Sequence, residues 1–190
     1  WRDGTSHLDA ALAGSIYDRD YLKARFASGE AWDWYYASDT DRAAQTRSAI
    51  TDGAHGKPWT FRAKDLAGWW GNLHKPRTGG VEGAATGWTP ASKPIWLTEV
   101  GCPAIDKGAN APNTFPDPKS SESSTPPFSL GLRDDLMQAR YLEAALDHFT
   151  PGTPGFADVH NPVSALYGGR MVDPDRVFLW AWDVRPYPAF

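Results

Sequence analysis

Apolar residues recur every three or four positions in parts of the chain, which is the spacing of an amphipathic helix. The longest such stretch covers residues 132–149, where the apolar positions are Leu132, Leu136, Ala139, Leu142, Leu146 and Phe149. The same spacing predicts a helix over residues 64–73, and helix-start residues predict shorter ones over 18–29 and 42–50. Residues 58–61 are predicted to form a short extended piece.

Two short apolar runs predict β-strands, and a long polar loop and the longest helix lie between them. The first run covers residues 95–100 and is bounded by Pro94 and Gly101; the second covers residues 177–183. Along residues 95–183 a strand is followed by a loop, a helix and a second strand, and this order predicts a βαβ unit. In such a unit the two strands are parallel and their C-terminal ends share one face.

Glu99 stands out because it places a carboxylate at the exit of a strand that we expect to be buried. A charge in a mostly apolar setting is costly unless it is paired or used, and in α/β barrels the C-terminal strand ends carry the chemistry. Trp182 and Asp183 close the second strand. We therefore expect Glu99 and these two residues to face one cavity, which is the layout of an active site.

Composition is that of a soluble globular chain with one core: 190 residues, 41% of them hydrophobic, and a net charge of -4. No basic patch suggests nucleic acid as a partner. The 10 Trp, 7 Tyr and 8 Phe residues are unusually many. Indole rings stack well on sugar rings, so this content suggests a saccharide ligand, although core packing is the more frequent role of any single Trp.

Other classes of site find little support in the sequence. Cys102 is the only cysteine, so no internal disulfide forms, and it is predicted to be a small buried residue. The five histidines lack ligand spacing, so we expect no metal, and no motif indicates a cofactor. No apolar run approaches the roughly 20 residues that span a bilayer.

The segment Thr98-Glu99-Val100-Gly101 after an apolar run, followed by a last strand rich in Trp, resembles strands seven and eight of retaining glycoside hydrolases with a (β/α)8 barrel. More closely, residues 94–106, 117–123, 133–136 and 178–188 resemble the TIM-barrel-like glycoside hydrolase domain of gene transfer agents and related phage tail proteins. The resemblance covers nearly the whole chain. It implies one TIM-barrel-like α/β domain over residues 1–190.

This resemblance also implies roles for individual residues. Glu99 matches the nucleophile, Trp180 and Trp182 match the floor of the sugar subsite, and Asp183 either orients substrate or bonds a neighbouring backbone. The implied partners are a polysaccharide or host surface glycan and other tail or baseplate proteins. The implied location is the tail of a phage-like particle, with a cytoplasmic stage before assembly.

The sequence departs from the resemblance in two ways. Retaining hydrolysis needs a second carboxyl group about 5 to 5.5 Å from the nucleophile. None of the remaining glutamates, which are Glu30, Glu82, Glu122 and Glu143, follows a predicted strand of the right kind. The chain is also shorter than the about 250 residues of a typical barrel. We therefore expect the C-terminal part of a barrel, with the acid/base upstream in a longer polypeptide.

Two functions from different classes remain open. The first is a retaining glycoside hydrolase that acts on cell-envelope polysaccharide with Glu99 as nucleophile. The second is a non-catalytic glycan-binding or structural module of the tail tip. Both use an aromatic surface, and they differ in whether a second carboxylate lies opposite Glu99.

Overall fold

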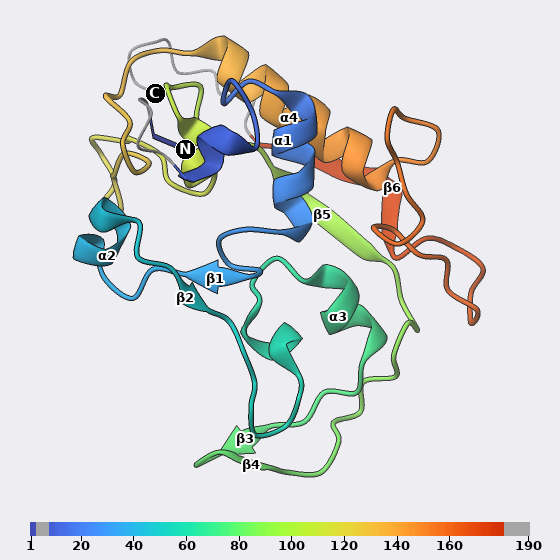
Figure 1. Cartoon of the computed structure of the whole chain (residues 1–190). Helices are drawn as coiled ribbons and strands as arrows, with labels where there is room; N and C mark the ends of the chain where they lie inside the picture. The colour runs from blue at the N-terminus through green and yellow to red at the C-terminus, as the bar shows by residue number, and fades with distance from the viewer. Residues whose placement is uncertain (3–7, 181–190) are drawn as a thin grey trace. The chain divides into compact units, whose positions relative to one another are not determined.

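The computed structural model describes residues 1–2 and 8–180, which form a mixed α/β structure (Figure 1). The helices are α1 (Arg19–Ala24), α2 (Asp39–Ala44), α3 (Leu66–Gly71) and α4 (Asp135–Phe149), with 3-10 turns η1 (Leu8–Ala11), η2 (Arg25–Ala27), η3 (Pro58–Phe61) and η4 (Gly108–Asn110). The strands are β1 (Trp34–Tyr35), β2 (Ser48–Ala49), β3 (Arg77–Thr78), β4 (Val81–Glu82), β5 (Ile95–Val100) and β6 (Val172–Leu179). They pair as β1-β2, β3-β4 and β5-β6, and no closed barrel forms among the described residues.

The chain folds into two compact units. Unit 1 comprises the described residues of 1–26, together with 97–156 and 176–180, and contains α1 and α4. Unit 2 comprises residues 27–96 and 157–175, and contains α3 and both short hairpins. Strands β5 and β6 begin in unit 2 and end in unit 1, so the C-terminal ends of both strands belong to unit 1.

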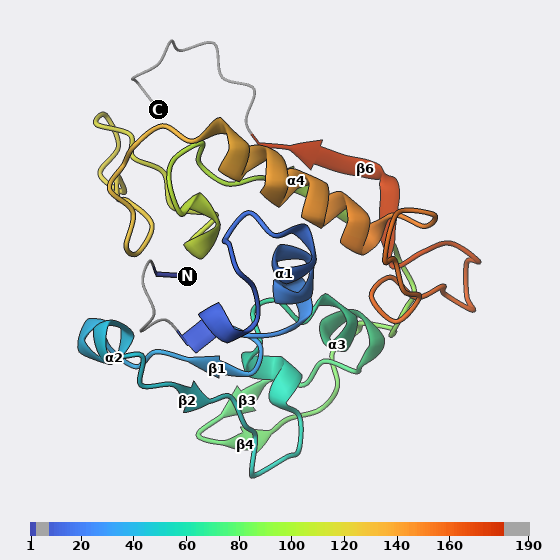
Figure 2. The ribbon, with the colours of Figure 1, turned by 45° about the horizontal axis from the view of Figure 1, so that its top comes forward.

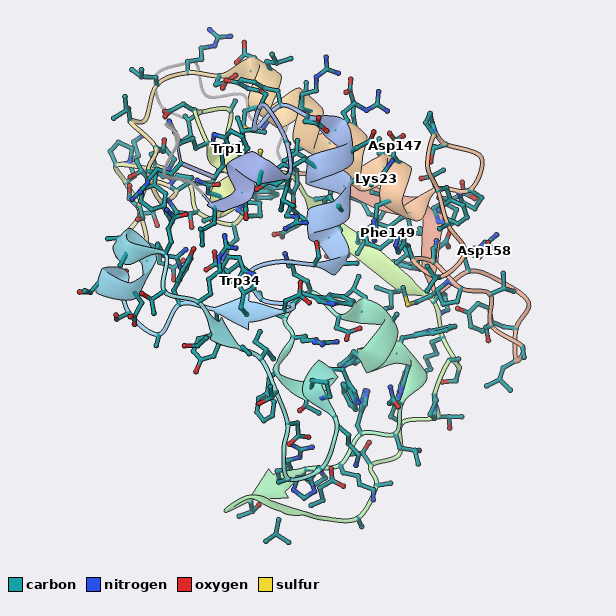
Figure 3. The ribbon with its side chains drawn as sticks, in the orientation of Figure 1. Trp1, Lys23, Trp34, Asp147, Phe149 and Asp158 are labelled. Atoms are coloured by element: carbon teal, nitrogen blue, oxygen red, sulfur yellow. The ribbon has the colours of Figure 1, made fainter. Side chains whose placement is uncertain are left out.

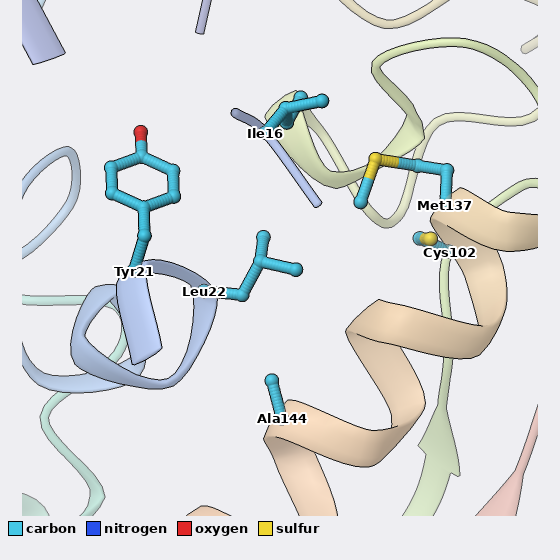
Figure 4. Packing of buried hydrophobic residues seen from close by; sticks show 6 residues of the cluster. All are labelled: Ile16, Tyr21, Leu22, Cys102, Met137 and Ala144. Atoms are coloured by element: carbon cyan, nitrogen blue, oxygen red, sulfur yellow. The ribbon is translucent and has the colours of Figure 1, made fainter. Parts of the chain in front are cut away.

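The core of unit 1 lies where α1 packs against α4 (Figures 2 and 4). It is formed by the buried residues Ile16, Tyr21, Leu22, Cys102, Met137 and Ala144. Each helix begins at an aspartate that caps it: Asp18 accepts from the Tyr21 amide at 2.9 Å, and Asp134 accepts from the Met137 amide at 3.0 Å. Helix α1 begins directly after Asp18, as predicted, whereas α4 begins at Asp135 instead of Leu132 because Asp134 caps it.

The buried face of α4 differs from the predicted one. Met137, Ala144 and His148 are buried, whereas Leu136 is 48% exposed and Leu146 is 37% exposed. Figure 3 labels Asp147 and Phe149 on the last turn of α4, where Arg19 of α1 pairs with Asp147. The small side chain at position 144 allows α1 to approach closely, which a leucine would prevent. Periodicity therefore identified the helix but not the face that it buries.

Two shorter predictions were also wrong. Residues Pro58–Phe61 form the 3-10 turn η3 instead of an extended piece, because the fixed φ of Pro58 suits the first position of a helical turn. The helix predicted over residues 42–50 is α2, which ends earlier because Gln45 adopts a left-handed conformation with φ 57°. Ser48 and Ala49 then form strand β2.

Strands β5 and β6 are parallel, as the βαβ order predicted. At their start the Ile95 amide donates to the Met171 carbonyl at 2.6 Å, and at their end the Trp180 amide donates to the Val100 carbonyl at 2.8 Å. From the first bond to the second, the chain advances nine residues along β6, from Met171 to Trp180, but only five along β5, from Ile95 to Val100. Because β6 is longer over the same stretch, it bends, as Figure 2 shows. Pro174, which has no amide proton, lies within this extra length.

Candidate functional site

The candidate site lies where β5 and β6 end side by side in unit 1. The bond from the Trp180 amide to the Val100 carbonyl joins the two strands one residue beyond Glu99. Directly after it, Gly101 lies against the Trp180 carbonyl so closely that a Cβ at position 101 would collide with the backbone. The absence of a side chain at Gly101 therefore allows the two strand ends to meet.

Glu99 is exposed, and within the part of the chain that the structure describes its carboxylate makes no hydrogen bond or ion pair. The expectation of a buried strand was wrong: in β5 only Val100 is buried, and Ile95 and Leu97 are partly buried. A sheet of two strands buries far less surface than the wall of a barrel, which explains the exposure. The carboxylate is accessible to a ligand from solvent.

Trp180 presents an indole ring beside this carboxylate's strand. Trp180 is 47% exposed although its backbone is fixed to β5. Phe178, two residues earlier and therefore on the same face of β6, is 49% exposed. The other two predicted site residues, Trp182 and Asp183, lie outside the described residues, and their roles stay predictions.

The chain after Gly101 is tied to the start of α4. Cys102 is completely buried, as predicted, and burial first and the nearby Asp134 second raise the pKa of its thiol to about 12. A protonated buried thiol is no nucleophile. The Cys102 carbonyl accepts from Gln138 Nε2 at 2.9 Å, and the Ala104 carbonyl accepts from the Asp134 amide at 2.8 Å. These bonds hold the exit of β5 in a fixed direction.

Tyr17 provides a further support that the sequence did not single out. Its hydroxyl donates to Asp134 Oδ2 at 2.6 Å, while the other Asp134 oxygen caps α4. The hydrogen bond to Asp134, followed by burial, raises the pKa of Tyr17 to about 12. Tyr17 therefore keeps its proton at neutral pH and acts as an anchor for α4. The only signal in the sequence was the helix-start aspartate itself.

Asp106 fixes the far end of the loop that leaves β5. Its carboxylate accepts from the Leu132 amide at 2.9 Å, from the Leu130 amide at 2.9 Å and from the Ser129 hydroxyl at 3.0 Å. Lys107 Nζ donates to it at 3.0 Å. Burial alone would raise the pKa of Asp106, but these donors outweigh burial and lower it to about 2.

Replacing Asp106 by asparagine is expected to loosen this loop by about 1–3 kcal/mol, because the amide NH2 faces donors instead of accepting from them. Hydrogen exchange of residues 104–132 should accelerate. Because the folded pKa of about 2 is below the ordinary 3.8, wild-type Asp106 stabilises the fold above about pH 4 and loses this effect as the pH falls towards 2. Unchanged exchange in D106N, or equal loosening in the exposed loop variant Glu122→Gln, would contradict this assignment.

Three of the other four glutamates form ion pairs. Glu82 ends strand β4 instead of lying in a loop, and it pairs with Lys57 at 2.6 Å and Arg77 at 3.1 Å. Lys57 is the main cause that lowers the pKa of Glu82 to about 2, which is unsuitable for a general acid. Glu30 pairs with Arg42 at 2.8 Å and Glu143 with Arg140 at 2.7 Å. Glu122 lies exposed in the loop.

Neither a metal-binding cluster nor a membrane-spanning helix is found in the described part of the chain. Within residues 1–2 and 8–180, no group of three or more His, Cys, Asp or Glu residues is arranged to hold a metal ion. None of the helices in the same residues has the length and apolar character required to cross a membrane.

Comparison with known proteins agrees with the resemblance in the sequence. The model of the GTA TIM-barrel-like domain family matches residues 1–190. The comparison with curated proteins finds no match to the chain. The family match spans both units and includes the strand ends at Glu99 and Trp180. The chain belongs to the gene transfer agent TIM-barrel-like domain family.

Proposed function

We propose that this chain is part of a glycoside hydrolase-like domain in the host-specificity protein of a gene transfer agent's tail, acting on cell-envelope polysaccharide. Family membership supports the relation to gene transfer agents. The observation that carries the enzymatic part is the accessible Glu99 carboxylate at the joined ends of β5 and β6, where Trp180 is also exposed.

The chemistry follows from an accessible carboxylate without an ion-pair partner among the described residues. Glu99 attacks the anomeric carbon, the glycosidic C–O bond breaks, and an acid protonates the departing oxygen. Water then attacks the glycosyl-enzyme ester, the same acid group now acts as base, and the sugar leaves with Glu99 restored. Trp180 supplies an apolar surface for the sugar ring.

We further propose that β5 and β6 are the last two strands of a barrel that earlier strands of a longer polypeptide complete. Within the described residues β5 and β6 pair only with each other, so each leaves one edge without a partner. Parallel strands with open edges and exposed apolar side chains are suited to further pairing. The acid/base opposite Glu99 then comes from those earlier strands.

A non-catalytic glycan-binding or structural module of the tail tip is the second candidate. It is favoured by the engagement of Glu30, Glu82 and Glu143 in ion pairs, because a carboxylate held by a cationic partner is a poor general acid. Such a module retains the aromatic surface but releases no sugar. The two candidates therefore differ in a measurable product.

The test uses the intact protein that contains this chain, incubated with polysaccharide purified from a recipient cell envelope. Proton NMR should detect new reducing ends whose first-formed anomer matches the configuration of the cleaved linkage. An inverted first-formed anomer would exclude Glu99 as a nucleophile. Binding of the polysaccharide without new reducing ends would establish the second candidate instead.

A further inference from the structure

Unit 2 contains a cleft of about 810 Å3 that the family resemblance did not point to. Its walls come from η3 on one side and from α3 and the segment after it on the other. The residues that matter for its chemistry are Trp59, Phe61, Arg62, Trp69, His74 and Lys75. The volume is within the range of pockets that hold small organic ligands, and it exceeds that of a single hexose.

The aromatic rings around the cleft form one connected group. The His74 ring lies 4.7 Å from the ring of Trp69 and stacks on Trp88 at 5.3 Å with an interplanar angle of 9°. Trp69 and Trp88 are 5.1 Å apart, and Trp59 is 5.9 Å from His74. His74 Nε2 donates to the Trp69 carbonyl at 2.7 Å. These contacts fix the ring planes before any ligand arrives.

The adjacent tryptophans of α3 have opposite environments. Trp70 is 4% exposed, and its indole Nε1 donates to the Lys93 carbonyl at 2.7 Å, so it anchors the helix. Trp69, its neighbour in sequence, is 46% exposed on the cleft wall, and Phe61 of η3 is 57% exposed. Trp70 therefore anchors the helix, and the exposed part of Trp69 is left for a ligand.

Polar groups at the cleft are mainly donors. Asp65 is occupied, because it accepts from the Gly68 amide at 2.7 Å and pairs with Arg62 at 3.5 Å. The buried Nε of Arg62 has no acceptor among the described residues. The Lys75 ammonium is 3.7 Å from its partner Glu82, and the Lys75 side chain is still 37% exposed. Flat exposed rings beside cationic donors suit a ligand with C–H faces and many oxygens.

We propose that this cleft binds a short stretch of saccharide, with one pyranose ring stacked on Trp69. The stacking uses the apolar C–H face of the sugar, and Arg62 and Lys75 donate to its oxygens. The choice of a saccharide over another oxygen-rich ring compound rests on the proposed function. The cleft would give the domain a second sugar contact, carried by unit 2, in addition to the one at Glu99 in unit 1.

The test measures saccharide binding by titration calorimetry in the intact protein carrying Glu99→Gln, so that turnover does not consume the probe. The probes are chitotetraose, cellotetraose and oligosaccharides prepared from the recipient envelope. Adding Trp69→Ala should weaken binding of at least one probe about tenfold or more. Phe61→Ala provides a second variant if Trp69→Ala fails to fold. Tyr35→Ala is the matched control, because Tyr35 is 47% exposed in the same unit and does not line the cleft.

The outcomes separate this inference from the proposed function. If saccharide binding depends on Trp69 and the protein releases no sugar, the proposed binding cleft is supported and the proposed hydrolase activity is excluded. Sugar release by the protein with no binding lost in Trp69→Ala or Phe61→Ala would overturn the cleft and leave the hydrolase intact. Equal losses in Tyr35→Ala, or no binding of any probe, would also overturn it.

Discussion

Replacing Glu99 by glutamine is expected to lower the rate of sugar release from envelope polysaccharide by at least about 1000-fold. The amide is nearly the same size as the carboxylate, so the exposed end of β5 should keep its structure. It carries no negative charge, however, and cannot form the glycosyl ester or stabilise the oxocarbenium-like transition state. Binding of the polysaccharide should change little, because aromatic surfaces such as Trp180 remain.

Glu143→Gln is the matched control for this prediction. It makes the same chemical change in unit 1, on helix α4, where Glu143 pairs with Arg140 instead of standing free. Release by E143Q should stay within about twofold of wild type, since exposed ion pairs contribute little to stability. Wild-type rates in E99Q, or equal losses in both variants, would remove Glu99 from the mechanism.

Replacing Gly101 by alanine is expected to destabilise unit 1 by about 3 kcal/mol, which is the upper end of the usual cost of overpacking. The new Cβ would collide with the Trp180 carbonyl, which is backbone and has no rotamer to change. To relieve the collision the ends of β5 and β6 must separate, which disturbs the bond between Trp180 and Val100. Sugar release should therefore fall together with the denaturation midpoint.

Gly14→Ala is the control for the backbone effect of removing a glycine. Gly14 lies in the same unit, and nothing lies within 4 Å of the position that its Cβ would occupy. This variant should be as stable as wild type or slightly more stable, because alanine restricts the unfolded chain. Full stability of G101A in chemical denaturation would show that the two strand ends do not meet as described.

Local patterns predicted the elements that depend on neighbours in the chain. The aspartates before α1 and α4, and the apolar run of β5, specify elements through hydrogen bonds and burial within a few residues. The pairing of β5 with β6 followed from the handedness and order of a βαβ unit. The buried face of α4 did not follow, because Met137 and Ala144 are apolar as the leucines are, and only the position of α1 decides which of them are buried.

The candidate site was likewise predictable only where local sequence specifies it. A glutamate that follows an apolar run marked Glu99, and family resemblance supplied its role. The anchoring bond of Tyr17 to Asp134 and the grouping of Trp69, His74 and Trp88 join residues far apart or on different segments, so no spacing rule reveals them. The exposure of Glu99 was missed because a buried strand needs neighbours on both sides, which β5 lacks in the described residues.

The family match supports a gene-transfer-agent-related domain, and the hydrolase mechanism is our proposal. Its central claim is that Glu99 forms a covalent bond to the sugar. A panel of 2-deoxy-2-fluoro glycosides with activated leaving groups slows the breakdown of that covalent intermediate. The intact protein is labelled with the panel and then digested, and mass spectrometry of the peptides locates the attached sugar. The account predicts one added glycosyl group on the peptide that contains Glu99. A label on another carboxylate, or release of sugar with Glu99 never labelled, would contradict it.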